Sequence, residues 1–260
     1  ATFAVFLPAL GHDFVNLDDY LLFLQNPHYR GFGLEQIRWA FTSMRQGIYK
    51  PLSWLTLSMD YALWGMDPRG YHLTNVLLHA LNAALFTALF ARLARWAAPE
   101  VFARGRAVIW PAAAAALFFA VHPLRVESVA WVSERRDVLS GAFYLLAAAL
   151  YLDPRRVQAR GRRRLGWTAG VWLVYLMALL SKASVLIFPV VLVGFDLYPL
   201  RALPYDPRRW LSPAARRLFV EKFPFFLASA AFGWVNIAGF QADGTVKSLA
   251  EFGVADRLAQ

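Results

Sequence analysis

The chain has 260 residues, of which 58% are hydrophobic and none is cysteine, and its mean hydropathy is +0.40. Soluble domains are about 45–50% apolar, so this composition is typical of a membrane protein, and the lack of cysteine excludes disulfides and thiolate metal sites. The net charge of +10 would suit nucleic-acid binding, but the arginines flank hydrophobic segments and are better read as topology signals, so we expect no nucleic-acid partner.

The first seventy residues combine a short apolar segment with a long polar and aromatic stretch. Residues 1–10 are too short to cross about 30 Å of hydrocarbon, and we interpret them as the end of a first, truncated span. Residues 11–70 are expected to form an outer loop. Within this loop, residues 34–43 and 51–65 have helix-like apolar spacing with tryptophans, which favours helices lying at the membrane interface.

Six further spans are expected between residues 71 and 240. They cover residues 71–96, about 106–121, 138–152 with an N-terminal extension, 167–181, 183–200 and 223–240. Residues 241–260 form a polar, amphipathic tail. The sequence therefore predicts an all-α polytopic membrane protein with one transmembrane domain over residues 1–260 and no tetratricopeptide repeat.

The basic residues gather in alternate gaps between these spans. Residues 92–107, 153–165 and 201–222 hold four, six and six lysines and arginines. The positive-inside rule makes these three gaps cytoplasmic, and a bacterial inner membrane is the expected location. The outer loop, residues 122–137, Lys182 and the C-terminal tail then fall on the outer face.

Asp18 and Asp19 are adjacent carboxylates between apolar runs, where burial is costly unless the charges are paired or used. One of them can act as a general base toward an acceptor hydroxyl, while the other orients it or holds a divalent cation. The alternative is a helix N-cap with a solvated neighbour.

A polar stripe runs along the next segment, YHLTNVLLHALN. His72, Asn75, His79 and Asn82 recur at spacings of three and four residues and therefore share one helix face. They indicate either a cavity wall that contacts substrate or hydrogen bonds between helices.

The segment HPLRVESVAWVSERRD over residues 122–137 mixes charged and apolar side chains. Pro123 ends the preceding helix, and Arg135 or Arg136 can pair with a neighbouring carboxylate or bind a phosphate. An ordinary solvated loop is the alternative, although the apolar interleaving favours packing. Lys182, isolated between apolar segments, either snorkels to the interface or neutralises a phosphate.

Five stretches occur in the order seen in one membrane family: FVNLDDY, YHLTNVLLHALN, HPLRVESVAWVSERRDVLSGAFYLLAAALYL, ALLSKASVLIFPVVLVGFDLYPL and EKFPFFLAS. Over nearly its whole length the chain resembles bacterial relatives of the transmembrane and tetratricopeptide-repeat O-mannosyltransferases, which are glycosyltransferases of the GT-C class. The block that begins at His122 is the most specific part of this resemblance.

The resemblance implies a GT-C-like helix bundle with interfacial helices in the first outer loop. It implies an enzyme that takes sugar from a polyprenyl-phosphate carrier and transfers it to a protein or glycan hydroxyl on the periplasmic face. By this carry-over, Asp18 would be the base and Asp19 its support. Three cations would neutralise the lipid phosphate: Lys182, Arg125 and Arg136. The remaining candidates for substrate contact are His72, His79, His122 and Glu127.

Members of that family commonly have more spans and a C-terminal array of repeats. The second hypothesis is therefore a non-catalytic membrane scaffold or assembly subunit that docks partner subunits through its outer loops. The sugar, the length of the carrier, the acceptor and any metal requirement stay open at this point.

Overall fold

The structure, a computed structural model, describes residues 2–16, 18–102 and 106–244. All helical or extended structure within these ranges is helix or single helical turn, apart from one isolated bridge between Arg45 and Ile48. Three of the helices are long and apolar enough to cross a membrane, judged by length and composition. The prediction of an all-α membrane protein is therefore confirmed.

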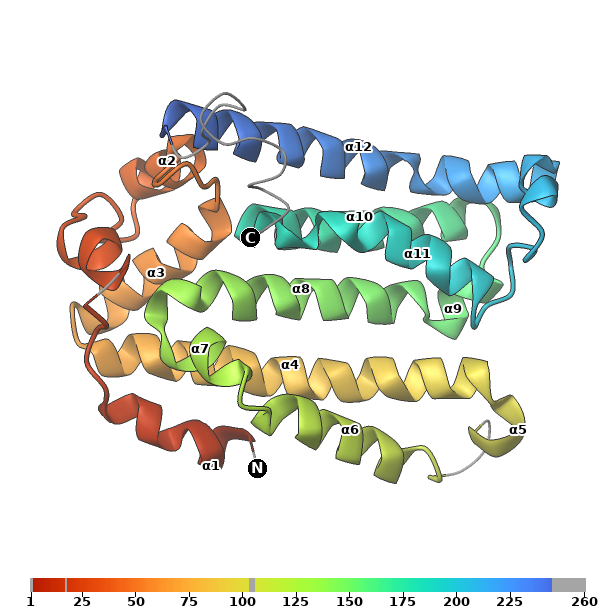
Figure 1. The fold of residues 1–260 in the computed structure, drawn as a ribbon, viewed down its shortest axis with the longest axis horizontal. Helices are drawn as coiled ribbons and strands as arrows, with labels where there is room; N and C mark the ends of the chain where they lie inside the picture. Colours follow the sequence, from red (N-terminus) through yellow and green to blue (C-terminus); the bar gives the residue numbers. More distant parts are fainter. Residues whose placement is uncertain (1, 17, 103–105, 245–260) are drawn as a thin grey trace, which may run out of the picture.

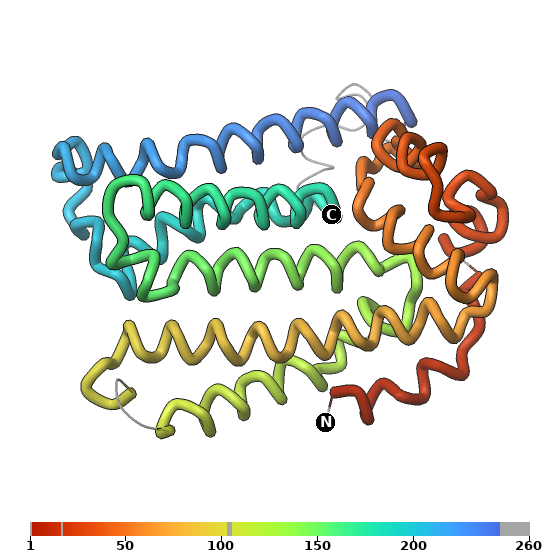
Figure 2. The backbone as a smooth tube through the Cα atoms, turned by 180° about the vertical axis from the view of Figure 1, so that it is seen from behind, coloured from red at the N-terminus to blue at the C-terminus, as the bar shows by residue number. Residues whose placement is uncertain are grey.

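The long helices lie side by side in one bundle (Figures 1 and 2). They are α4 (Pro68–Ala97), α8 (Arg135–Tyr151), α10 (Gly161–Ser181) and α12 (Pro213–Ala242). Helix α6 (Ile109–Val121) packs on α4, and α11 (Phe188–Leu197) packs on α12. The main apolar core lies between α8, α10 and α11 and includes Tyr175 and Phe188.

The helices that qualify as membrane spans are α4, α10 and α12. The expected span over residues 183–200 divides into a 3₁₀ turn, Ala183–Ile187, and α11. Helix α6 has 13 residues and, at a rise of 1.5 Å per residue, measures about 20 Å, which is shorter than the hydrocarbon core. Apolar segments that the sequence presents alike thus differ in length within the bundle.

Several helices begin at the same local sequence signal, an aspartate or serine followed by proline. The first side chain accepts a hydrogen bond from a backbone N–H two or three residues later, and the proline occupies the first helical position, where no N–H is needed. This pattern starts α4 at Asp67, α9 (Pro154–Gln158) at Asp153, η5 (Pro207–Leu211) at Asp206 and α12 at Ser212.

The first outer loop forms a cap over one end of the bundle, at the left in Figure 1. Its elements are α1 (Thr2–Phe6), η1 (Leu7–Gly11), η2 (Tyr20–Leu24), α2 (Leu34–Thr42) and α3 (Pro51–Trp64). The cap has an apolar core of its own around Phe23, Tyr29 and Trp54. Helices α2 and α3 occupy the two segments that the sequence assigns to the interface.

Three contacts fasten this cap to the ends of α10 and α12. Ser53 Oγ donates to the carbonyl of Ser181 at 2.9 Å, and Tyr49 N donates to Asn236 Oδ1 at 3.4 Å. Gly47, at a φ of +70°, lies directly on Gly239, where an added methyl group would overlap the Gly47 carbonyl. The cap is therefore packed on the bundle rather than tethered loosely to it.

The bundle separates two kinds of polar group by its length. The basic gaps lie at the end that carries α5 (Pro99–Phe102), α9 and η5, whereas the cap and η3 (Val132–Glu134) lie at the other end (Figure 1). Between them, α7 (Arg125–Ala130) joins α6 to η3. Beyond Gly244, the expected C-terminal tail lies outside the described residues.

Candidate functional site

Asp19 joins the cap to the turn that precedes α8. Its carboxylate is fully buried and accepts hydrogen bonds from Val15 N at 3.0 Å, from Ser133 N at 3.0 Å and from Ser133 Oγ. Burial raises the pKa of Asp19, while the hydrogen bonds from Ser133 and Val15 oppose that rise. Because its acceptor positions are engaged within the protein, Asp19 holds the loop in place.

Asp18 has different surroundings, although it is the next residue in the chain. Its side chain is half-buried, and among the described residues it makes no hydrogen bond or ion pair. Its charge acts on Lys50, which approaches from the segment before α3. The structure thus divides the acidic pair into one engaged carboxylate and one that is available to a substrate.

A cluster of charged side chains lies where α8 begins and α10 ends. Lys182 Nζ donates to Glu134 Oε2 at 3.2 Å and also contacts Asp137, and Arg136 Nε donates to Glu134 Oε1 at 3.1 Å. Burial raises the pKa of Glu134, but hydrogen bonds with Asp137 and Arg136 and the nearby cations outweigh it and bring the pKa to about 2. Glu134 is therefore an anion that holds two cations together.

Lys50 completes this cluster and was not among the residues that the sequence singled out. It is 2% exposed, and its ammonium lies 5.0 Å from the centre of the Trp54 ring. Burial and the charges of Arg136 and Lys182 lower its pKa to about 7, against the opposing effect of Glu134 and Asp18. Lys50 is thus a cation that can lose its proton near neutral pH.

One sequence signal could have pointed to Lys50. The chain contains only four lysines among its 27 basic residues. Two of them, Lys50 and Lys182, lie in this cluster, and Lys222 is buried against Asp196. Because lysine is the basic side chain whose pKa shifts readily on burial, its rare use in an arginine-rich chain marks sites of special environment.

A small cavity of about 190 Å³ adjoins the cluster between α4, α6, α7 and α8. Its polar lining includes His79, Arg125, Ser128 and Asp137. The Arg125 guanidinium lies 4.5 Å from the centre of the Phe119 ring. Asp137 belongs to both the cavity and the charged cluster, because it also contacts Lys182. Two of the predicted phosphate ligands, Arg125 and Lys182, are therefore linked through one carboxylate.

The polar stripe on α4 mainly holds helices together. Asn75 Nδ2 donates to the carbonyls of Val129 and Trp131, and Asn82 Nδ2 donates to Val138 O at 2.8 Å. His79 Nε2 lies 2.9 Å from Ala120 O. Of the two readings that the sequence left open, hydrogen bonding between helices describes these residues, and His79 also lines the cavity.

Arg135 and Arg136 are separated in the same way as the two aspartates. Arg135 is completely buried, where its guanidinium pairs with Asp60 Oδ2 at 2.6 Å and donates to Tyr71 O at 2.9 Å. Only Arg136 joins the cluster with Glu134. Arg135 therefore holds α3 and α4 against α8, and Arg136 is the one available to a ligand.

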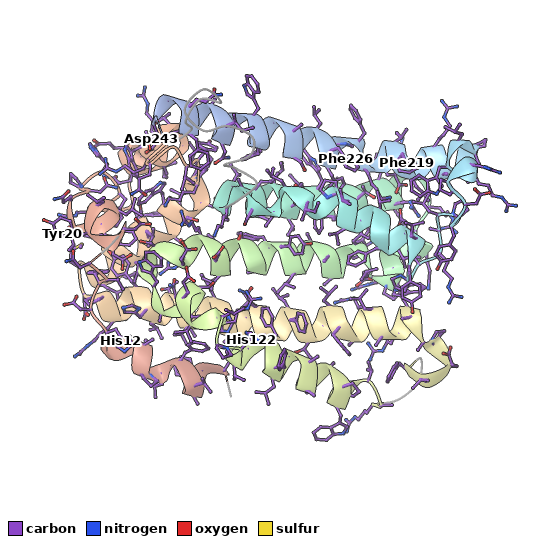
Figure 3. The ribbon with its side chains drawn as sticks, in the orientation of Figure 1. His12, Tyr20, His122, Phe219, Phe226 and Asp243 are labelled. Atoms are coloured by element: carbon purple, nitrogen blue, oxygen red, sulfur yellow. The ribbon has the colours of Figure 1, made fainter. Side chains whose placement is uncertain are left out.

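Three predicted contacts are not brought into the cluster or the cavity. His72 is buried edge-on to His12, within electrostatic range of Asp19. His122 lies at the junction of α6 and α7, well away from Tyr20 in the cap (Figure 3), and its Nδ1 accepts from Leu124 N at 3.3 Å. Glu127 is exposed on α7.

The residues at this end offer little for a divalent cation. Asp19 already accepts three hydrogen bonds, and the described residues contain no group of three or more His, Asp or Glu placed to hold a metal. A cation at Asp18 would therefore take most of its ligands from substrate phosphate and water.

Comparison with known proteins finds relatives among proteins named O-mannosyl-transferases. The chain is 37% identical to protein O-mannosyl-transferase tmtc2 of Xenopus laevis over 48% of its own length and 14% of that protein. It is 32% identical to Tmtc2 of Drosophila melanogaster over 75% of its own length and 20% of that protein. For human TMTC4 the values are 39%, 38% and 14%.

The matched stretch is thus a fifth or less of the length of each of these relatives. No protein-family model and no solved structure matches the chain. The chain is therefore related in sequence to proteins named O-mannosyl-transferases, over a segment that carries the cap, the charged cluster and the bundle.

Proposed function

We propose that this chain forms the catalytic membrane part of a GT-C type glycosyltransferase, which transfers a sugar from a polyprenyl-phosphate carrier to a hydroxyl group of a protein or glycan. The observation that carries the proposal is the pairing of an unengaged carboxylate, Asp18, with the cations Lys50, Arg136 and Lys182 at one end of a membrane bundle. The names of the relatives support it and favour mannose as the sugar and a protein as the acceptor.

The chemistry follows from these residue types. Asp18 accepts the proton of the acceptor hydroxyl as its oxygen attacks the anomeric carbon of the sugar. The bond between that carbon and the phosphate oxygen breaks, and polyprenyl phosphate leaves with its electron pair. Attack from the face opposite the phosphate inverts the anomeric configuration.

The cluster would stabilise the leaving group by charge. Lys182 and Arg136 already neutralise carboxylates in the protein, and an arriving phosphate would share or replace those partners. Cations fixed before the reaction stabilise charge that develops in the transition state, because they need little reorganisation. A phosphate held in this way leaves without being protonated.

The adjoining cavity suits a donor headgroup. Its volume of about 190 Å³ is below the ~300–1,000 Å³ of typical ligand pockets, which fits a phosphate or a single sugar ring rather than a whole lipid. Arg125 would contact the donor phosphate there, and His79 would contact the sugar. The carrier chain would then extend along the apolar helices beside the cavity.

The sidedness of the reaction follows from the charge pattern. The arginine-rich gaps lie at the opposite end of the bundle from Asp18 (Figure 1), and short basic loops face the cytoplasm. We therefore place the reaction on the periplasmic face of a bacterial inner membrane. A divalent cation bridging Asp18 and the donor phosphate is compatible with this scheme, and chelation tests it.

The decisive experiment measures release of polyprenyl phosphate by mass spectrometry, with the full-length protein in liposomes and a panel of polyprenyl-phosphate sugars. Asp18→Asn should abolish release without loss of folded protein. Asp13→Asn is the matched control, because Asp13 is an exposed carboxylate of the same loop, and it should keep full activity. No release from any donor by folded wild-type protein would refute the proposal and support the scaffold hypothesis.

A further inference from the structure

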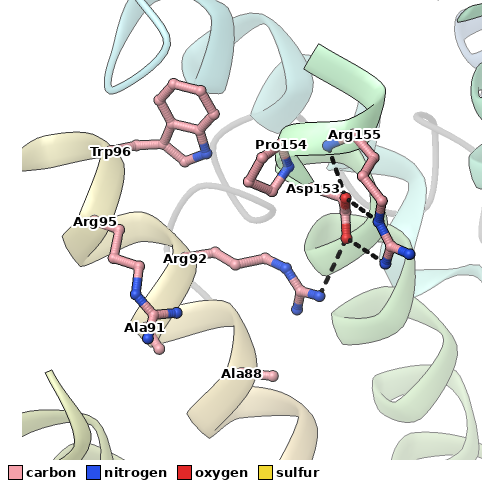
Figure 4. A pocket seen from close by; sticks show the side chains of 8 residues that line it. All are labelled: Ala88, Ala91, Arg92, Arg95, Trp96, Asp153, Pro154 and Arg155. Carbon is pink, nitrogen blue, oxygen red and sulfur yellow. Dashed lines mark hydrogen bonds and ion pairs between the residues drawn. The ribbon is translucent and has the colours of Figure 1, made fainter. Parts of the chain in front are cut away.

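A second polar site lies at the basic end of the bundle, far from Asp18. There a cavity of about 610 Å³ opens between the last turns of α4 and the start of α9. Figure 4 shows Arg92, Arg95 and Trp96 reaching it from α4, and Asp153 and Arg155 from the start of α9. Two alanines of α4 complete the wall, so that one side of the cavity is apolar.

Asp153 positions two of the three guanidinium groups. It is almost fully buried and accepts from Arg155 Nε at 3.1 Å, from the Arg155 backbone N–H at 2.9 Å and from Arg92 at 3.4 Å. These bonds hold Arg92 and Arg155 on the two sides of one carboxylate, as the dashed lines in Figure 4 show. The geometry is therefore fixed by the same residue that caps α9.

The charge at this cavity is not balanced. Three arginines face a single carboxylate, and no acidic side chain of the described residues pairs with Arg95, which is exposed. A net charge of about +2 beside an apolar wall favours an anion that brings apolar substance with it. This is a feature of a ligand site rather than of a solvated basic loop.

A neighbouring cavity extends the site along α10. It measures about 750 Å³ and is lined by Arg155 and Arg163 together with Trp167, Gly170 and other residues. The Arg155 guanidinium lies 5.5 Å from the centre of the Trp167 ring. Arg155 thus stands between two cavities, and each of them contains a further arginine and a tryptophan.

We propose that this end of the bundle binds the phosphate of an anionic phospholipid between Arg92, Arg95 and Arg155. The acyl chains would lie along the apolar surfaces of α4 and α10. Both helices qualify as membrane spans, so their ends lie at the depth of the headgroups, where tryptophan is also favoured. Basic pockets between membrane helices recognise such headgroups by charge.

The test compares two variants that remove the same charge from the same end of the molecule. Arg92→Gln with Arg95→Gln alters the cavity and leaves Asp153 and Arg155 in place. Arg216→Gln with Arg217→Gln is the control, because both arginines are exposed near the start of α12 and line neither cavity. The purified full chain is incubated with phosphatidylglycerol or phosphatidylcholine, and retained lipid is counted by native mass spectrometry.

We expect retention of phosphatidylglycerol but not of phosphatidylcholine, reduced about tenfold or more by the cavity variant and unchanged in the control. Addition of inorganic phosphate in excess should not displace the lipid. Equal retention by both variants, equal retention of phosphatidylcholine, or displacement by inorganic phosphate would each overturn the assignment. If the double variant does not fold, Arg95→Gln alone decides the question, since Arg95 has no protein partner among the described residues to lose.

Discussion

Replacement of Asp19 by alanine tests whether the acidic pair is divided as the structure describes it. The change removes the acceptor of three hydrogen bonds, from the Ser133 N–H, the Ser133 hydroxyl and the Val15 N–H. Asp18→Ala removes a carboxylate of the same kind from the adjacent position without breaking any bond to a described residue. The two variants should therefore separate stability from turnover.

The magnitude follows from which donors can find water. Val15 is 38% exposed, so its N–H can be hydrated in the variant, whereas Ser133 is 3% exposed and cannot. A buried donor left without a partner costs about 1–3 kcal/mol, and two such donors on Ser133 give about 2–4 kcal/mol after relief of the buried charge. For a chain of this size that corresponds to a fall of about 5–10 °C in Tm.

The assay is thermal unfolding of the purified protein in detergent, followed by tryptophan fluorescence, with polyprenyl phosphate release measured alongside it. Asp19→Ala should unfold at lower temperature, and Asp18→Ala should unfold near the wild-type temperature while losing turnover. Equal destabilisation by both changes would refute the division of roles, since it would mean that Asp18 is also engaged within the protein.

Three further predictions concern buried contacts. Asp60→Asn should destabilise the protein by about 3–5 kcal/mol, because it leaves the guanidinium of Arg135 buried without its charge partner, and chemical denaturation should show a smaller loss for the double change with Arg135→Met. Gly239→Ala should lower the Tm through overlap with the cap, whereas Gly233→Ala, whose nearest neighbour is a side chain at 3.7 Å, should not. Since the folded pKa of Lys50 is about 7 and its ordinary value is 10.5, the unfolded chain binds more protons between these values, so stability should rise with pH over that range. In Lys50→Met that rise should disappear from unfolding curves measured at a series of pH values.

The sequence predicts much of the fold because its signals are local. Apolar spacing places α2, α3 and α4, and the aspartate–proline and serine–proline pairs place several helix starts. Each of these signals acts within a few residues of the element that it defines. The alternation of basic gaps likewise predicts that Asp18 and Lys182 share one end of the bundle, and the structure places both there.

Much less of the candidate site could be predicted, because its members are chosen by contacts between distant segments. Adjacent residues on a helical turn point about 100° apart, so Asp18 and Asp19 face different neighbours, and so do Arg135 and Arg136. The sequence shows each pair as equivalent. Only packing of the cap on the start of α8 engages Asp19 and Arg135 and leaves the other member of each pair available.

By itself, then, the sequence determined an all-α membrane protein with its arginines at one end and a charged outer face at the other. The tertiary structure decided which charged groups meet. Lys50 and Lys182 are separated by most of the chain, yet both lie in the electrostatic field of Glu134 and Arg136, because α3 and the end of α10 pack together. Local propensity specifies helices, whereas the burial of charge, which depends on every neighbour at once, is specified only by the assembled fold.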